Sequence, residues 1–333
     1  MLVFPLLAAS GKRVRFLPRF TAGETLRYQI ESRTTTTGKA TEPIQNPEGS
    51  SQLTQTANLV VRLDVLGVEP GTPALMGKIH MKATYEKSSA KTETDGYDPT
   101  AQSLEEQYNR LEGRSMEFTV GPDGKLSDMK GIEDVLENPS AAGAARSWMS
   151  GIASGAGFPK DGIIPGQRWS NERPLDGTPL GGLIWRSEST YLRDEPCGAT
   201  SGAAGGAQSA EIDANTSAPP PEQPPAHAPG ATDMCALILT RFEIVRGPGG
   251  AKGDDTPEDY RRNGLRTTGV WTGAGQSLDS ISLSTSLLIS STQTSKQDMN
   301  FDIVSATAGS KIHYAGHVDS ESQITLLPQE PPS

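Results

Sequence analysis

The sequence predicts a mainly β (α+β) protein, built either as one large curved antiparallel sheet or as two packed antiparallel sheets, with a few short helices in the middle of the chain. Two observations predict this class. Segments that alternate apolar and polar residues recur in both halves of the chain, and a period of two is typical of strands with one buried face. Residues that favour turns, above all glycine and proline, separate these segments.

The clearest pair of strands is predicted at 183–193 and 236–246, and the only two cysteines, Cys197 and Cys235, lie just beyond their inner ends. We expect these strands to pair and to be closed at the tip by a disulfide; two unpaired thiols are the alternative. A bridge across a loop of this size stabilises a fold by about 3–5 kcal/mol in the chain-entropy model. The Gly-, Ala- and Pro-rich residues 198–234 are expected to form a disordered insert.

The first part of the chain predicts a meander of antiparallel strands with one solvated face. In segment 24–36, for example, Leu26, Tyr28 and Ile30 alternate with polar residues. The other strands expected in this part are 14–20, 53–66, 75–88, 114–120 and 125–129.

Helices are expected in the middle of the chain. Asp98 is suited to cap a helix that begins at Pro99, and Gly113 is suited to end it. Two further short helices are predicted at 132–137 and 140–154, where small and apolar residues recur at helical spacing.

After these helices the chain is expected to be almost wholly β. Beyond the disulfide-closed pair, residues 247–259 are predicted to form a loop, and a turn is predicted at Gly273 and Gly275. The short strands predicted in this part are 264–272, 277–284, 287–296, 298–306, 311–318 and 320–327. The expected division of the chain is a signal-like remnant (1–12), an N-terminal meander with one helix (13–130), a helical connector (131–165), a C-terminal antiparallel region (166–327) and a disordered tail (328–333).

Composition limits the partners that the protein can have. The chain has 40 acidic and 30 basic residues and a net charge of −10. A broad nucleic-acid surface needs clustered Lys and Arg, so no nucleic-acid partner is expected. No stretch approaches the ~18 consecutive apolar residues that span a membrane, so no transmembrane segment is expected.

The first residues suggest export. Residues 1–10 form an apolar run that ends in small residues, like the second half of a secretory signal peptide, although the basic start of such a signal is missing. Together with the predicted disulfide, which persists outside the cytosol, this favours an exported soluble protein, periplasmic or extracellular, over a cytosolic one.

The residue types that carry chemistry do not assemble into a reactive motif. His313 and His317 lie in an alternating segment, and on a strand they would be about 13 Å apart, too far for one metal ion. The usual nucleophile signatures are missing. We therefore expect no catalytic residues, no metal and no cofactor, while catalytic groups that converge from distant positions stay open as the least favoured alternative.

One group of apolar residues is a candidate binding site. Large side chains concentrate in the helical middle and at the start of the C-terminal strands, where an apolar helix across a curved sheet can leave a crevice for a ligand. The alternative is that they simply form the core. The candidate residues are Trp148, Met149, Ile152, Phe158, Trp169 and Trp185.

Three stretches carry a family resemblance: Phe-Thr-Ala-Gly-Glu-Thr-Leu-Arg-Tyr at 20–28, Gly-Gln-Arg-Trp at 166–169, and the run from 275 to 291. Together they resemble an uncharacterised family of exported bacterial proteins, a domain of unknown function. The resemblance implies an exported β-rich protein and transfers no activity or functional residue. Long antiparallel strands that enclose short helices are also similar, in architecture alone, to the half-barrels of periplasmic lipoprotein carriers.

The functional hypothesis is a non-enzymatic exported envelope protein that binds a lipid-like or other apolar ligand between sheet and helices. The alternative is a structural or protein-interaction module without a small ligand, whose partner would be another envelope protein.

Overall fold

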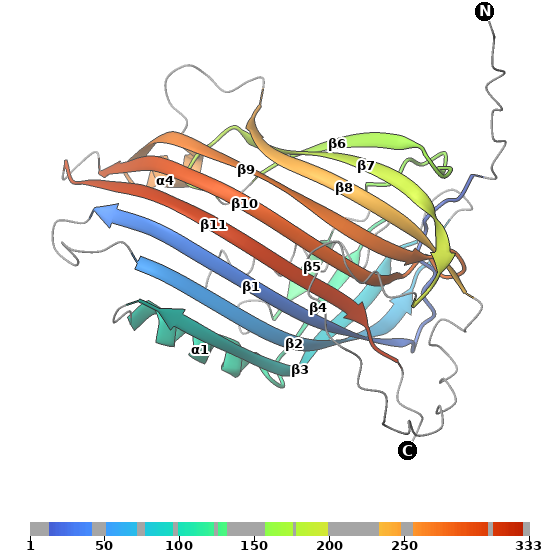
Figure 1. Ribbon diagram of the computed structural model, residues 1–333. Helices are drawn as coiled ribbons and strands as arrows, with labels where there is room; N and C mark the ends of the chain where they lie inside the picture. The colour runs from blue at the N-terminus through green and yellow to red at the C-terminus, as the bar shows by residue number, and fades with distance from the viewer. Residues whose placement is uncertain are drawn as a thin grey trace, which may run out of the picture.

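The structure is a computed structural model of the chain (Figure 1). The described residues are 13–41, 51–71, 77–95, 99–122, 126–131, 157–175, 178–198, 233–247, 256–305 and 309–328. The helices predicted at 132–137 and 140–154, the N-cap Asp98, the signal-like residues 1–12 and almost all of the predicted insert lie outside them.

The described strands form one antiparallel sheet of 11 strands, in the order β5-β4-β3-β2-β1-β11-β10-β9-β8-β7-β6. This confirms the mainly β class and settles the choice between one sheet and two. The strands are β1 (Thr25–Thr41), β2 (Ser51–Val68), β3 (Ile79–Thr94), β4 (Ser115–Val120), β5 (Leu126–Lys130), β6 (Arg168–Pro174), β7 (Leu183–Pro196), β8 (Met234–Arg246), β9 (Leu265–Ser282), β10 (Leu288–Ser305) and β11 (Lys311–Leu326).

Neighbours in the sheet are neighbours in the sequence, with one exception: β1 pairs with β11. This pairing joins the two halves of the chain, and it runs from Tyr28 opposite Leu326 to Thr41 opposite His313. The residues between β5 and β6 therefore connect the two outer edges of the sheet.

The sheet curls around one of its faces. A single cluster of buried apolar residues contains Met81 and Phe118 from β3 and β4 together with Tyr191 and Ile238 from β7 and β8. These strands are far apart in the sheet order, so their side chains meet only because the sheet is strongly curved. In Figure 1, β4 and β5 accordingly lie behind the central strands. We call the face that bears this cluster the inner face, and the opposite one the outer face.

The N-terminal segment lies within this curve. Val14 forms an isolated antiparallel bridge with Ile163. The Phe16 ring lies 4.9 Å from the ring of Phe158 and 6.1 Å from that of Tyr191. Residues that precede β1 are thereby held against the residues that lead into β6.

The predicted disulfide-closed pair is confirmed. β7 and β8 pair antiparallel, with Leu183 opposite Arg246 at one end and Glu195 opposite Cys235 at the other. Cys197 and Cys235 form a disulfide at that second end.

Helix α1 (Pro99–Leu111) confirms the helix predicted from Pro99, and Gly113, at φ +79°, follows its end. The helix runs along the part of β3 that β4 leaves unpaired (Figure 1). Glu105 accepts a hydrogen bond from the backbone N–H of Thr92, and Glu112 accepts one from that of Ser88. The helix and the residue that follows it thus satisfy donors of an open sheet edge, which otherwise invites pairing with another chain.

The predicted boundaries of the last strands were wrong. Six short strands were expected from residue 264 onward, whereas the structure has three long ones, β9 to β11. The expected turn at Gly273 and Gly275 is instead the middle of β9, because neighbouring side chains lie directly against these glycines. Residues 247–259 were expected to be a loop, but helix α4 (Glu258–Arg262) begins within them.

Among the described residues, neither helix has the length and apolar character that crossing a membrane requires.

Replacing Cys197 and Cys235 together by Ala is expected to lower the free energy of unfolding by about 4 kcal/mol. The reason is that the unfolded chain regains the freedom of a loop whose ends are 38 residues apart. Urea denaturation followed by circular dichroism measures the change. Wild-type protein in reductant is the control and should reach the midpoint of the double variant; an unchanged midpoint in both would contradict the prediction.

Candidate functional site

The inner face of the sheet has three zones. Residues directly opposite each other in an antiparallel pair share a face, so the register assigns every inner position. The buried apolar cluster occupies the end where β7 and β8 carry the disulfide. A band of short polar side chains crosses the middle, and a second apolar cluster lies beyond it.

The first zone is a filled core. Tyr28, Tyr85 and Tyr191 are fully buried or nearly so. Burial raises the pKa of Tyr28 well above its usual value, and the charge of Glu24 adds to the rise. The Tyr28 hydroxyl donates a hydrogen bond to the Leu288 carbonyl oxygen at 3.1 Å. This zone therefore holds the fold together and leaves little room for a ligand.

The second apolar cluster includes stacked aromatic rings. The rings of Trp185 and Phe242 lie 4.3 Å apart and nearly parallel. Phe301 stacks between Trp271, at 6.3 Å, and Tyr314, at 5.1 Å. Trp185, Trp271 and Tyr314 are only half-buried, so these rings offer apolar surface. We call these five residues the aromatic platform.

Glycines in β9 allow the rings to lie flat on the sheet. A Cβ at Gly275 would overlap the Phe242 ring and the Thr294 carbonyl oxygen. Gly269 has φ +149°, and a Cβ there would overlap the backbone of Phe301. Glycine in a strand interior weakens the strand and marks a close approach, so its presence here indicates that the platform depends on it.

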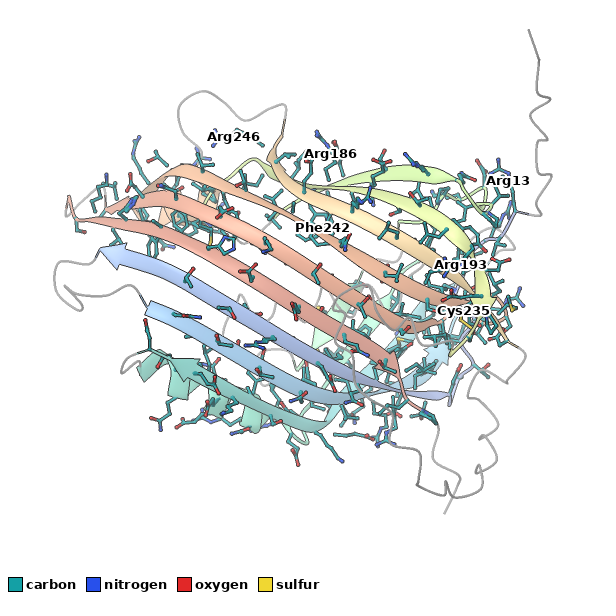
Figure 2. All side chains as sticks on the ribbon, in the orientation of Figure 1. Arg13, Arg186, Arg193, Cys235, Phe242 and Arg246 are labelled. Carbon is teal, nitrogen blue, oxygen red and sulfur yellow. A yellow bond between two sulfur atoms is a disulfide. The ribbon has the colours of Figure 1, made fainter. Side chains whose placement is uncertain are left out.

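Two arginines border the aromatic platform. Arg173 lies on β6 opposite Trp185, with its guanidinium carbon 5.4 Å from the centre of the Trp185 ring. Arg246 lies on β8 opposite Leu183 and donates a hydrogen bond to the Gly269 carbonyl oxygen at 3.2 Å. Figure 2 shows Arg246 and Cys235 at the two ends of β8, with Phe242 between them.

The polar band is formed mainly by hydroxyl and amide side chains. Ser189 and Thr240 lie 2.9 Å apart, and Thr34 and Ser320 3.2 Å apart, each pair at hydrogen-bonding distance. The amide nitrogen of Gln55, next to Thr34 in the register, is buried without a partner among the described atoms.

Asp279 is the acidic group at the boundary of the polar band and the first zone. Ser291 donates a hydrogen bond to its Oδ1 at 2.6 Å and Ser277 one to its Oδ2 at 3.1 Å. Burial raises the pKa of this carboxyl group, and the two hydrogen bonds act in the opposite direction. An uncompensated carboxylate in such a place is costly, so the two serines offset part of its desolvation.

The predicted site residues fall into three groups. Trp148, Met149 and Ile152 lie outside the described residues. Phe158 and Trp169 contact each other, with ring centres 5.9 Å apart, and pack against the first zone. Trp185 belongs to the aromatic platform. The structure therefore places Trp169 and Trp185 in different clusters.

Four platform residues were missed by the sequence reading: Phe242, Trp271, Phe301 and Tyr314. They come from four strands, and only the register brings them to one place. The available signal was the glycines at 269, 273 and 275, because glycine within an alternating segment indicates a close contact.

The histidines lie on the outer face and pair with aspartates. His313 Nδ1 is 2.8 Å from Asp302 Oδ1. His317 Nδ1 is 2.8 Å from Asp298 Oδ1, and its Nε2 is 3.1 Å from Asp319 Oδ2. Within the described ranges, no group of His, Cys, Asp and Glu is arranged to hold a metal ion.

A groove of about 820 Å³ crosses β7 to β11 on the outer face. Two rows of side chains form its walls, and opposite charges alternate along them. Arg186 pairs with Glu243 at 3.2 Å and Lys296 with Asp319 at 3.3 Å, so much of the wall charge is already neutralised. The outer-face residues that line the groove are Arg186, Glu188, Arg241, Glu243, Ala274, Gln276, Thr294, Lys296, Asp319 and Glu321.

Replacing Gly275 by Ala is expected to lower the free energy of unfolding by about 1–3 kcal/mol, because the added methyl group displaces Phe242 or the neighbouring strand. Thermal or urea unfolding measures this, and near-ultraviolet circular dichroism reports the disturbed stack of Phe242 and Trp185. The control is Ala274→Ser, an exposed position on the other face of the same strand. Equal stability of the two variants would contradict the packing argument.

The pKa of His317 is expected to lie above its usual value of 6.5, because of the hydrogen bond to Asp298, with the charge of Asp319 adding to the effect. The folded state then favours protonated His317, so this stabilisation is fully present below pH 6.5 and is lost as the pH rises through the folded pKa. NMR titration of the imidazole signals measures the pKa. Asp298→Asn should lower it, whereas the control Asp302→Asn, at the partner of His313, should not. A His317 pKa at or below 6.5 would contradict the prediction.

Comparisons with models of known protein families and with curated proteins found no match for this chain.

Proposed function

We propose that this is a non-enzymatic exported protein that binds an apolar or amphipathic ligand on the aromatic platform. The observation that carries the proposal is the platform itself: three half-buried aromatic side chains stack on buried neighbours on the curved inner face. Aromatic surface of this kind contributes most of the contact energy in many binding sites.

The surroundings of the platform support binding of a ligand with one apolar and one polar part. Partly buried apolar side chains, among them Met299 and Ile303, extend the platform. The polar band lies next to it along β9 and β10, where Gln297 accepts a hydrogen bond from the Trp271 indole at 3.1 Å. A ligand on the rings would meet hydrogen-bonding groups on one side and arginines on the other.

Export is part of the proposal. The disulfide between Cys197 and Cys235 supports it, because structural disulfides persist in oxidising compartments. The apolar residues at the start of the chain support it too. A periplasmic or extracellular carrier or receptor for a poorly soluble ligand would fit both features.

The alternative function is a protein-interaction module, and the outer groove is the observation that favours it. Its alternating charges are suited to a partner surface with complementary charges. We prefer the inner face, because ion pairs within the groove already neutralise most of its charges.

Binding of the fluorescent apolar probe N-phenyl-1-naphthylamine tests the proposal. The wild-type protein should enhance its emission, and Trp271→Ala should weaken binding about five- to tenfold, because an aromatic contact of this kind is worth roughly 1 kcal/mol or more. The matched control is Val270→Ala, since Val270 precedes Trp271 and is exposed on the outer face. Native mass spectrometry after mild extraction from the exporting cell should show a retained small molecule.

A wild-type protein that does not bind the probe would overturn the proposal. So would an equal loss of binding in Val270→Ala and Trp271→Ala, because the platform would then not be the site.

A further inference from the structure

The charges around the aromatic platform have one sign. Among the described residues, the inner positions of β6 to β11 that surround the rings include Arg173 and Arg246 and no Asp or Glu. The acidic residue on the inner face of β9 is Asp279. It lies six residues, about 20 Å along the strand, from Gly273, which is level with Trp185 across the sheet. This positive end is notable in a chain with a net charge of −10.

Arg173 lacks an anionic partner in the described part of the chain. Its side chain is exposed, and its guanidinium carbon lies over the ring of Trp185. Arginines on the outer face of the same strands differ: Arg186 pairs with Glu172 at 2.7 Å, and Arg168 lies 3.7 Å from Glu188. An exposed guanidinium without a counter-charge among its described neighbours is accessible to an anion from solution.

The position of Arg173 leaves its donors available. The guanidinium makes no hydrogen bond with another described residue, so its five N–H donors remain available. These donors match the two oxygens of a carboxylate or phosphate group. Arg246 lies at the same end of the inner face, where it donates to the Gly269 carbonyl oxygen.

We propose that the ligand of the aromatic platform is an anionic amphiphile, whose apolar body lies on the rings and whose carboxylate or phosphate headgroup is bound by Arg173. This rests on the proposed function and adds the class of ligand to it. The electron-rich ring of Trp185 holds the guanidinium in place, so the apolar part and the headgroup are recognised by adjacent residues on β6 and β7.

Isothermal titration calorimetry below the micelle concentration tests the inference with four probes of equal chain length: dodecanoate, dodecyl phosphate, the neutral dodecyl maltoside and the cationic dodecyltrimethylammonium. The wild-type protein should bind the two anions about tenfold more tightly than the neutral probe, and the cation most weakly. The preference should decrease with added salt, because screening weakens charge pairing at a partly exposed site. Which anion binds more tightly identifies the headgroup.

Arg173→Gln should bind the neutral probe as the wild type does and lose the preference for anions, whereas Arg173→Lys should keep part of it. Arg168→Gln is the matched control, since Arg168 is on the same strand but faces outward, and it should keep the full preference. Thermal unfolding confirms that each variant is folded.

The outcomes separate the two proposals. If no probe binds the wild-type protein, the proposed function fails. If neutral and anionic probes bind equally well, or if Arg173→Gln retains the preference for anions, the headgroup assignment is overturned while the proposed function stands.

Discussion

The pairing of β1 with β11 is the interaction on which the rest of the structure depends. It joins the first strand to the last, and its register from Tyr28 opposite Leu326 to Thr41 opposite His313 fixes which residues of both halves share the inner face. A shift by one residue would turn the inner side chains of one half outward. Tyr28 opposes such a shift, because its buried hydroxyl donates to Leu288 from the other half of the chain.

Curvature and binding surface arise from the same long strands. At one end the curled sheet brings β4 near β7 and encloses a filled apolar core. At the other end the glycines of β9 leave room for rings from β8 and β10 to lie on the sheet. Buried apolar residues at one end of the sheet therefore stabilise the fold, and half-buried aromatic rings lie at the other end. The polar band separates the two.

The fold was largely predictable from the sequence, and the site was not. Alternation in segments such as that of Leu26, Tyr28 and Ile30 depends on local burial, so the strands, the disulfide-closed pair and the helix from Pro99 could be predicted. Gly273 and Gly275 were interpreted as a turn because glycine favours both turns and close packing, and only the Phe242 and Ile244 side chains of the neighbouring strand decide between them. The platform depends on pairings between strands that a single sequence does not contain.

The two ends of the inner face differ in charge. The energy of interaction between charges at this separation determines whether the difference can orient a bound ligand. Arg173 is level with Trp185 and Gly273 across the sheet, and Asp279 lies six residues, about 20 Å, from Gly273 along β9. At 20 Å two unit charges interact by roughly 0.2 kcal/mol in water and about 0.8 kcal/mol at an effective dielectric constant of 20. Repulsion from Asp279 is therefore too weak to orient an anionic ligand. Its orientation has to come from direct contact, and the side chain placed to provide that contact is Arg173, held over the ring that the apolar part of the ligand would touch.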